Sequence, residues 1–347
     1  MYLQTGFMPS ELVHRDELVK QVASIIAPAL RMERPSNLFV YGKTGTGKTL
    51  SIKHTTDKLL SVAKRGAVPI QKLYVNCKLK NVADTEYRLI VSLARELGKP
   101  LPSTGLPTDD IYKAFFSAVD SEKQLVLLIL DEIDQLAKKA GDDVLYNLTR
   151  INEELKNAQI SIIGISNDLL FVDNLDPRVK SSLSEEEILF PPYNALQLQD
   201  ILMNRADIAF KKESIEAGVI EKCAAFAARE HGDARRALEL LRVSGELADR
   251  RGAAKVAIAD VDVAEEKIER DKIADLITTQ PKQAQLALYS ILSISRGVNK
   301  FIFTGEVYES YKKYCSELGI RPLTQRRMSD ILSELDMLGI ITARVIS

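Results

Sequence analysis

The sequence has few of the features that mark a secreted or membrane protein. Its three cysteines, Cys77, Cys223 and Cys315, are odd in number and widely separated, and no two of them form a C-x-x-C pair. This spacing suggests neither a disulfide framework nor a zinc site, so we expect reduced thiols. No apolar run is long enough to cross a bilayer, and the first ten residues lack the layout of a signal peptide. We therefore expect a cytoplasmic protein without a membrane partner.

The bulk composition is that of a globular protein with more than one domain. The chain has 347 residues, of which 46% are hydrophobic and 27% are charged, and this length exceeds one ordinary compact domain. The net charge is only -1, yet residues 270–347 carry 11 Lys and Arg against 8 Asp and Glu, a local charge of +3. Clustered cations favour nucleic-acid binding because they neutralise phosphates, and a solvated face is the alternative.

Short apolar runs alternate with helical stretches in the first half of the chain. Such runs are typical of the buried strands of a parallel sheet that is covered by helices on both faces. The Pro- and Gly-rich segment 99–108 interrupts the pattern as a loop between two helices. We therefore predict an α/β domain over residues 1–188. Its expected strands are residues 38–41, 72–76, 125–130 and 160–166.

The rest of the chain is predicted to be mostly helical. Pro191 and Pro192 punctuate the sequence, and helical spacing with Ala- and Leu-rich faces predicts a second domain over residues 189–270. Residues 271–347 have the order helix, helix, turn, helix, strand, which is typical of a winged helix-turn-helix. The expected helices are residues 273–294, 304–318 and 324–338, and the expected strand is residues 339–346.

The segment GKTGTGKT, from Gly42 to Thr49, has the pattern of a phosphate-binding loop. It follows an apolar strand and precedes a helix that begins near Lys48, which is the context that such a loop requires. Glycines let the backbone wrap the phosphates with its N–H groups, and the helix N-terminus adds partial positive charge. We expect Lys48 to reach the β- and γ-phosphates and the Thr49 hydroxyl to ligate Mg²⁺. A flexible glycine-rich turn is the alternative.

Two of the expected strands end in polar residues. Asp131 and Glu132 follow the strand 125–130 and are placed at the edge of the sheet where the phosphates lie. We expect Asp131 to hold Mg²⁺, directly or through water, and Glu132 to orient and deprotonate an attacking water. Asn167 follows the strand 160–166 and is suited to hydrogen-bond the γ-phosphate or that water. A helix cap for the acids and a turn for the asparagine are the alternatives.

With these motifs in place, the chain resembles the AAA+ ATPases, and more narrowly the archaeal Orc/Cdc-type origin-recognition initiators. The resemblance covers essentially the whole chain. It is carried by FMPSELVHRDEL at residues 7–18, LDPRVKSSLSEEEILFPPY at 175–193 and HGDARRAL at 231–238. It implies an AAA+ core, an α-helical lid and a C-terminal winged helix, with ATP or ADP and Mg²⁺ as ligands.

The resemblance also implies roles for residues outside the phosphate loop. The stretch 13–15 is similar to the element that packs beside the adenine, and a plain helix start is the alternative. Arg235, in a G-x-x-R motif, is similar to an arginine that reaches from the lid to the γ-phosphate, with Arg236 as the next candidate. Arg178 resembles an arginine finger that acts on a neighbour's nucleotide, and a structural ion pair is its alternative.

These expectations together define the nucleotide site. The residues expected to act in catalysis are Lys48, Asp131, Glu132, Asn167, Arg235 and Arg178. Those expected to hold the metal are Thr49 and Asp131. Those expected to bind the nucleotide are Val13, His14, Arg15, Gly42, Lys43, Thr44, Gly45, Thr46, Gly47, Lys48, Thr49, Leu50, Tyr193 and Arg235.

The predicted last helix has the pattern of a DNA-recognition helix. Met328 and Leu335 keep the helical period and face the core, which turns Arg326, Ser329 and Ser333 outward. Such a face would offer side chains to base edges in the major groove, while neighbouring cations meet phosphates. A solvated face or a protein-contact surface is the alternative.

The loop 99–108 lies where the family carries an insertion that touches the minor groove of origin DNA, so the resemblance implies contact through shape as well as bases. An ordinary surface loop is the alternative. The cations Lys312 and Lys313 are further phosphate-contact candidates. The residues expected to bind DNA are Ser103, Thr104, Gly105, Leu106, Lys312, Thr324, Gln325, Arg326, Arg327 and Ser329.

The resemblance implies a replication initiator that binds duplex origin DNA at the nucleoid. ATP and ADP would act as a conformational switch with slow hydrolysis, and the protein would act with related initiators to recruit the replicative helicase. A clamp-loader-like or remodelling ATPase and an ATP-sensing transcription regulator are the alternatives. Because family members continue through a basic β-wing, we expect this chain to be a shortened form that lacks much of the wing.

Overall fold

The computed structural model describes residues 2–4, 7, 9, 12–79, 83–183, 185–295 and 301–344. The chain divides into two compact units, Met1–Val261 and Asp262–Ser347. The first unit contains an α/β core and a small group of helices, and the second unit is helical in its described part. None of the described helices is both long and apolar enough to span a membrane.

A five-stranded sheet forms the centre of the α/β core. All four strand pairings are parallel, and the strand order is β2-β3-β4-β1-β5. The four predicted strands are confirmed to within two residues at each end. The fifth strand was not predicted, because only Ile188 of its four residues is buried and the other three are exposed. The strands are β1 (Leu38–Tyr41), β2 (Ile70–Asn76), β3 (Leu125–Asp131), β4 (Gln159–Ser166) and β5 (Glu186–Leu189).

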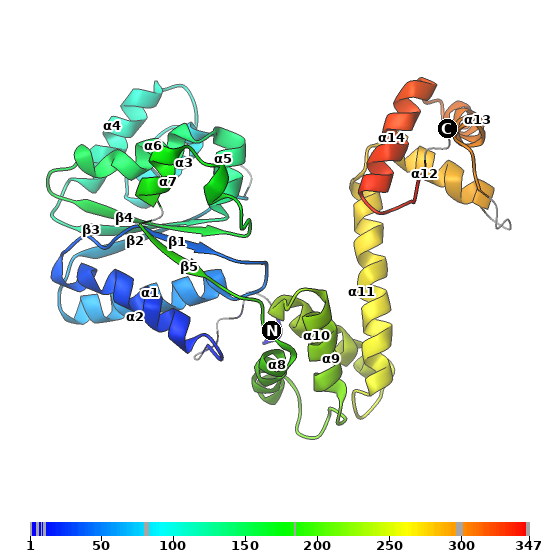
Figure 1. Cartoon of the computed structure of the whole chain (residues 1–347), viewed down its shortest axis with the longest axis horizontal. Coiled ribbons are helices and arrows are strands. Elements are labelled where there is room, and N and C mark those ends of the chain that lie inside the picture. Colours follow the sequence, from blue (N-terminus) through cyan, green and yellow to red (C-terminus); the bar gives the residue numbers. More distant parts are fainter. Residues whose placement is uncertain are drawn as a thin grey trace. The chain divides into compact units, whose positions relative to one another are not determined.

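Helices cover both faces of this sheet (Figure 1). Helices α1 and α2 lie on one face, and α3 to α7 lie on the other. The loop predicted at 99–108 is confirmed between α3 and α4. The bounds are α1 (Asp16–Ile26), α2 (Lys48–Arg65), α3 (Glu86–Glu96), α4 (Thr108–Val119), α5 (Ile133–Ala140), α6 (Asp143–Arg150) and α7 (Pro177–Leu183).

Strand β3 is buried on both faces, and this explains the continuous apolar run in its sequence. Side chains alternate between the two faces of a strand. Leu125, Leu127 and Ile129 pack in the core under α1 and α2, whereas Val126 and Leu128 pack in the core on the other face. Burying each of these side chains contributes roughly 1.5–3 kcal/mol. The strand is therefore fixed from both sides, and its carboxyl end is held at a defined place.

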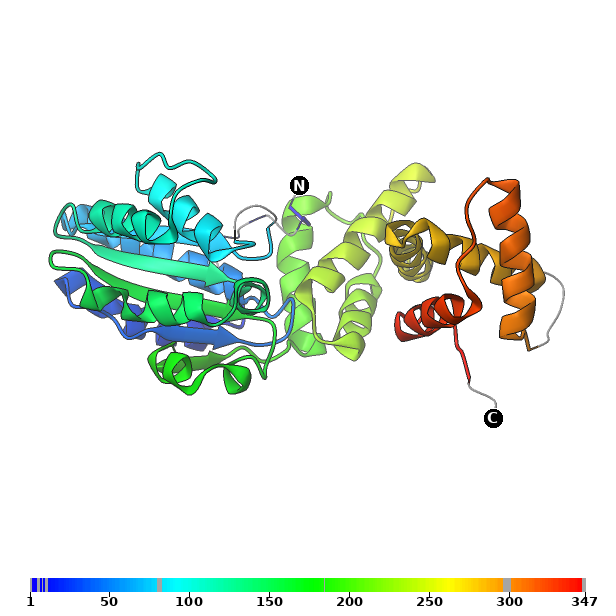
Figure 2. The ribbon, with the colours of Figure 1, turned by 90° about the horizontal axis from the view of Figure 1, so that it is seen from above.

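Three helices form the lid that follows the sheet, and they pack on one another (Figure 2). They are α8 (Ala195–Ala209), α9 (Val219–Glu230) and α10 (Ala234–Arg250). A capping box starts α8: the Gln197 amide donates to Asn194 Oδ1 at 2.9 Å, and the Asn194 amide donates to Gln197 Oε1 at 3.1 Å. The helical structure predicted for the segment after the sheet is confirmed.

The second unit contains a small core with the predicted helical face. Helix α11 (Ile258–Thr279) runs into this unit, and α12 (Lys282–Ser295), α13 (Thr304–Glu317) and α14 (Gln325–Met337) complete its described helices. Met328, Ile331 and Leu335 of α14 are buried against Ala287 and Tyr311. The predicted inward face of the last helix is therefore confirmed.

Two details of the C-terminal prediction were wrong. The helix expected at 273–294 is two helices, because the chain breaks between α11 and α12 at Gln280 and Pro281. Proline lacks the N–H that a helix requires and disfavours helical geometry at the residue before it. The strand expected at 339–346 is absent from residues 339–344, and the remaining two residues lie outside the described part of the chain.

A close backbone contact joins the segment after β5 to the start of α10. The Tyr193 amide donates to the Gly232 carbonyl at 3.2 Å. Gly232 has φ +66°, and a Cβ there would lie 2.4 Å from the Tyr193 carbonyl oxygen. Only glycine can adopt this positive φ without strain and also leave the space beside the Tyr193 carbonyl free.

We predict that Gly232→Ala lowers the free energy of unfolding by about 3 kcal/mol, because left-handed strain adds to a backbone clash. Gly252→Ala is the matched control, since Gly252 has φ +70° but no atom within 4 Å of the added Cβ. It should lose only about 1 kcal/mol. Urea denaturation of both variants measures the difference, and equal losses would contradict the assigned contact.

Candidate nucleotide-binding site

The phosphate-binding loop opens into a pocket of about 710 Å³. A volume of this size suits a small-molecule ligand. Its lining comes from five parts of the first unit: the N-terminal segment, the phosphate-binding loop with the start of α2, the carboxyl ends of β2, β3 and β4, Tyr193 before α8, and the lid helices α8 and α10. Polar side chains line the pocket at the loop, at the strand ends and on part of the lid, and aliphatic side chains such as Val13, Ile201 and Leu238 line much of the rest.

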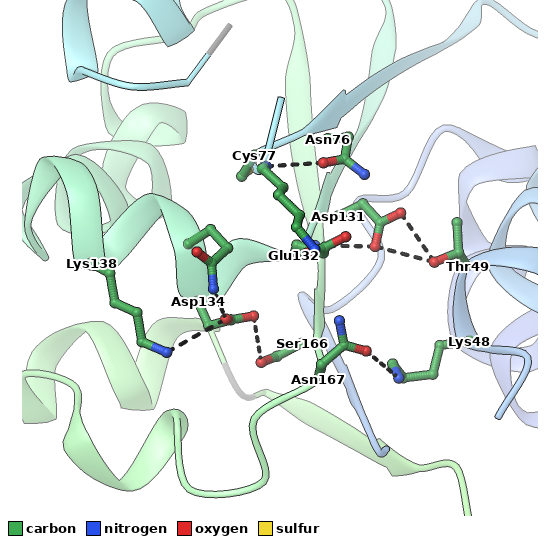
Figure 3. Close-up of polar contacts among 12 residues, drawn as sticks. Lys48, Thr49, Asn76, Cys77, Asp131, Glu132, Asp134, Lys138, Ser166 and Asn167 are labelled. Carbon is green, nitrogen blue, oxygen red and sulfur yellow. Dashed lines mark hydrogen bonds and ion pairs between the residues drawn. The ribbon is translucent and has the colours of Figure 1, made fainter. Parts of the chain in front are cut away.

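Lys48 is held by the loop that precedes it. Its ammonium donates to the carbonyl oxygens of Gly42 and Lys43, at 2.7 and 2.8 Å, and to Asn167 Oδ1 at 2.8 Å. Figure 3 shows Lys48 and Asn167 pointing toward each other. Burial lowers the pKa of Lys48 to about 8, and the positive charge of Arg235 adds to this lowering. The Lys48 cation is thus fixed at a place where an anionic ligand would offset the free-energy cost of burying its charge.

The Asp131 carboxylate accepts hydrogen bonds from three residues. Thr49 Oγ1 lies 3.2 and 3.0 Å from its two oxygens, and the Tyr74 hydroxyl donates to Oδ2 at 2.7 Å (Figure 3 shows the Thr49 contact). The Glu132 amide donates to Oδ1 at 3.1 Å. Burial next to this carboxylate raises the pKa of Tyr74, so its hydroxyl remains a donor.

The oxygen atoms of Asp131 and Thr49 are suitable ligands for a magnesium ion. Thr49 and Asp131 supply a hydroxyl and a carboxylate, the hard oxygen ligands that Mg²⁺ prefers. Mg²⁺ is usually held by one or two such protein groups together with substrate phosphates and water. The two predicted metal-binding residues are therefore side by side at the pocket wall.

Glu132 occupies a strained position at the pocket. It has φ +55° and immediately precedes α5. Such a conformation in a residue other than glycine costs roughly 1–3 kcal/mol and is concentrated at functional sites. Its carboxylate lies 3.6 Å from the exposed Lys78 ammonium. By contrast, the nearby Asp134 is buried and accepts from Ser166 Oγ at 2.9 Å, so it belongs to the core.

Of residues 13–15, one lines the pocket and the other two contact the elements around it. Val13 lines the pocket. His14 Nε2 lies 2.7 Å from Asp200 Oδ2 on α8, and its side chain is not part of the described lining. Arg15 is buried under the loop, where its Nε donates to the Thr46 carbonyl at 3.0 Å.

Arg15 also ties the loop to the segment that leads into the lid. Its Nη2 donates to the Pro191 carbonyl at 2.6 Å, and its guanidinium lies 3.7 Å from the centre of the Tyr193 ring. Burial lowers the pKa of Arg15. Tyr193 itself lines the pocket. Among the described residues, Arg15 therefore supports the phosphate-binding loop from behind.

The lid places Arg235 and Arg236 in different surroundings. Asp233 caps α10 by accepting the Arg235 amide at 2.7 Å, and the Arg235 side chain is exposed and lines the pocket. Arg236 is buried, with its Nε 3.3 Å from Glu230 Oε2. The Ala234 amide donates to the Gly45 carbonyl at 3.2 Å, so the lid touches the phosphate-binding loop directly.

The remaining predicted residues form the loop or lie outside the pocket. Gly42, Lys43 and Thr44 belong to the loop but not to the described lining, whereas Gly45, Thr46, Gly47 and Leu50 line the pocket. Arg178 lies outside it and is exposed, with its Nη2 2.9 Å from Asp176 Oδ2. This arginine lowers the pKa of Asp176 to about 2.

Three protein families match this chain, and together they span most of it. An AAA domain matches residues 31–171, the Cdc6 AAA+ ATPase-type lid domain matches residues 199–266, and the CDC6 C-terminal winged helix domain matches residues 275–347. The ORC1-type DNA replication protein of Thermococcus onnurineus is 51% identical over 99% of this chain and 83% of its own length. This chain belongs to the Orc1/Cdc6 family of AAA+ ATPases.

Other relatives agree with this family assignment. The ORC1-type DNA replication protein 1 of Methanosarcina mazei is 49% identical over 99% of this chain and 83% of its own length. The solved structure of the Aeropyrum pernix ORC1 protein in complex with DNA is 44% identical, with a TM-score of 0.86, and the match covers 100% of this chain and 89% of that one. The Orc1/Cdc6 fold predicted from the motifs is thus confirmed: an AAA+ core, a lid and a winged helix.

In the winged helix of this Orc1/Cdc6 chain, α14 carries the residues predicted to contact DNA. Thr324 Oγ1 caps the helix by accepting the Arg327 amide at 3.4 Å, and Gln325, Arg326 and Ser329 are exposed. The Arg327 guanidinium lies 3.3 Å from Asp330 Oδ2. On α13, the Lys312 ammonium lies 2.7 Å from Glu309 Oε1.

The loop between α3 and α4 is exposed but fixed at its base. Arg95 donates to the Leu101 carbonyl at 2.6 Å and to Ser103 Oγ at 2.9 Å. Gly105 has φ +101°, and the side chain of Leu106 is 38% exposed. The predicted tip, Ser103 to Leu106, therefore faces solvent.

Several residues of the pocket lining were not predicted from the sequence, and two of them make polar contacts at the site. Tyr74 touches Asp131 because β2 and β3 pair with Asn76 opposite Asp131, and that pairing brings Tyr74 alongside. Arg205, on α8, donates to the Phe7 carbonyl at 3.4 Å and lies 4.5 Å from the centre of the Phe7 ring. Neither residue belongs to a recognisable motif, and only the strand order and the lid position bring them to the site.

We predict that Arg15→Met lowers the free energy of unfolding by about 2 kcal/mol, because the buried Thr46 carbonyl and the partly buried Pro191 contact lose a charged donor. Arg31→Met is the matched control, since Arg31 is 65% exposed and pairs with Glu33 at the surface. It should change stability by less than about 0.5 kcal/mol. Thermal and urea denaturation compare the two variants, and a loss for Arg31→Met as large as for Arg15→Met would contradict this assignment.

Proposed function

We propose that this chain is a replication initiator that binds duplex origin DNA and uses bound ATP or ADP as a conformational switch. The observation that carries the proposal is the meeting of Lys48, Asp131 and Arg235 around one pocket in a chain of this family. Relatives at about half identity are named as DNA replication proteins. One solved relative is named as a complex with DNA.

The pocket supports slow hydrolysis of ATP. Lys48 and the loop amides would bind the phosphates, and Arg235 would approach the γ-phosphate from the lid. Thr49 and Asp131 would hold Mg²⁺, which neutralises phosphate charge when bound. Glu132 would take a proton from water as the water attacks the γ-phosphorus and the bond to the ADP oxygen breaks.

The arrangement of arginines supports a switch with low turnover. Arg178 lies outside the pocket of its own chain and would act only on the nucleotide of a neighbouring molecule. An arginine supplied by a neighbour contributes strongly to phosphoryl transfer. The lid contact at Gly45, together with the link that Arg15 makes from Thr46 to Pro191, would let the bound nucleotide bias the lid position.

The DNA-contact surfaces would lie in both units. Gln325, Arg326 and Ser329 would face base edges in the major groove, with Arg327 and Lys312 on phosphates. The loop tip, from Ser103 to Leu106, would enter the minor groove. We further propose a division at 1–188, 189–270 and 271–347, a place at the nucleoid in the cytoplasm, and recruitment of the replicative helicase together with related initiators.

We predict that Lys48→Ala lowers ATP affinity by about 10- to 100-fold, because a charged phosphate ligand is lost. Glu132→Gln should keep affinity but slow single-turnover hydrolysis by about 100-fold, because the general base is lost. The controls are Lys64→Ala on the exposed face of α2 and Glu122→Gln before β3. Wild-type hydrolysis by Glu132→Gln would remove its role as base.

We predict that Arg326→Ala weakens binding to origin DNA by about 5- to 100-fold, because a base-edge contact is lost. Leu106→Ala should reduce protection at the minor-groove site. Footprinting compares these variants with Arg65→Ala and Leu196→Ala, which alter exposed side chains outside both sets of predicted contact residues. Unchanged protection by both test variants would refute the DNA-facing assignment, and genome-wide binding at promoters instead of origins would favour a transcription regulator.

A further inference from the structure

Three residues, Thr49, Tyr74 and Glu132, donate hydrogen bonds to the Asp131 carboxylate, and only Thr49 belongs to the phosphate-binding motif. Thr49, the last residue of that motif, donates from α2. Tyr74 donates from β2 to Oδ2 at 2.7 Å, which is the shortest of the hydrogen bonds to this carboxylate among the described residues. Asp131 is only 4% exposed. Because so little of it contacts solvent, its carboxylate is oriented mainly by hydrogen bonds from protein groups.

The sheet register places Tyr74 at this carboxylate. In the β2–β3 pairing, Tyr74 lies opposite Ile129 and Asn76 lies opposite Asp131. Because successive side chains alternate between faces, Tyr74 and Asp131 share the face that is covered by α2. A tyrosine side chain at this position is long enough to span the two residues to the strand end, where the carboxylate lies.

Helix α2 contacts this pair a second time. The Lys53 ammonium lies 3.7 Å from the centre of the Tyr74 ring. Lys53 follows Thr49 by four residues, so the two side chains lie on the same face of the helix. One helix therefore fixes the carboxylate through Thr49 and the ring through Lys53. Tyr74, Lys53, Thr49 and Asp131 all line the same pocket.

We propose that Tyr74 is a positioning residue for Mg²⁺. Its hydroxyl fixes the rotation of the Asp131 carboxylate so that this carboxylate and the Thr49 hydroxyl can bind the ion together. The proposal rests on the proposed nucleotide function. The terminal torsion of an aspartate is broad, so its carboxylate orientation depends on the hydrogen bonds that it accepts. Thr49 and the Glu132 amide supply two donors, and the Tyr74 hydroxyl on Oδ2 restricts the rotation further. Groups that orient metal ligands in this way are typically worth 10- to 100-fold in metal affinity.

A purely structural hydrogen bond is the competing explanation, and the chain supplies a matched control for it. Tyr112 on α4 donates to Glu86 Oε1 on α3 at 2.5 Å. This pair is also a half-buried tyrosine with a carboxylate, and it lies outside the pocket. Tyr112→Phe therefore removes the same chemical interaction without touching the proposed metal site.

The test measures how Mg²⁺ changes the affinity of the full chain for a fluorescent, non-hydrolysable ATP analogue. Tyr74→Phe should bind the analogue within about twofold of wild type in EDTA and require about tenfold more Mg²⁺ for half-maximal tightening. Tyr112→Phe should match wild type in both measurements. A Tyr74→Phe midpoint equal to that of wild type overturns the proposal and leaves the nucleotide site standing. A wild type that binds no analogue overturns both.

A double-mutant cycle with Asp131→Asn provides the second readout. If Tyr74 acts through Asp131, Tyr74→Phe should change the Mg²⁺ midpoint by less than about twofold once Asp131 is already altered. A tenfold change that persists in the Asp131→Asn background would show that Tyr74 acts by another route and would contradict the proposal. Melting temperatures measured without nucleotide establish that each variant is folded.

Discussion

The nucleotide site depends on one constraint, the alignment of carboxyl ends in a parallel sheet. Strands β1, β3 and β4 run in the same direction, so the phosphate-binding loop, Asp131 and Asn167 emerge at one edge. The buried side chains of β3 fix that edge from both faces. Lys48 then meets Asn167, and Thr49 meets Asp131, across segments that are more than 80 residues apart in sequence. The pocket chemistry follows from this geometry.

The loop that holds the phosphates is also joined to the lid. Arg15 binds the Thr46 carbonyl and the Pro191 carbonyl, and the Ala234 amide binds the Gly45 carbonyl. The acceptor in each contact is a backbone carbonyl, so a change in loop geometry is transmitted through the Arg15 guanidinium and the Ala234 amide. A ligand that alters the loop would alter the lid, and the reverse holds by thermodynamic linkage. This is the physical basis for the nucleotide switch that we propose.

Local patterns in the sequence were sufficient for much of this fold and for the motif residues of the site. The inner strands were predictable because they are buried on both faces, whereas β5 was missed because Ile188 is its single buried residue. The break at Pro281 was missed although residues 278–283 carry no apolar helix-forming side chain, because the apolar positions before and after it were assigned to one helix. Tyr74 and the supporting position of Arg15 depend on strand order and on packing between distant segments. No pattern within a short window contains that information.

The central claim is that a nucleotide lies between the phosphate-binding loop and the ends of β3 and β4, with the lid arginine beside it. A crystal structure of this chain with Mg²⁺ and a non-hydrolysable ATP analogue tests it most directly. The account predicts phosphate oxygens within hydrogen-bonding distance of Lys48 Nζ and the loop amides, and Mg²⁺ beside Thr49 and Asp131. Nucleotide bound at another place, or phosphates that leave Lys48 and Thr49 without contact, would contradict it.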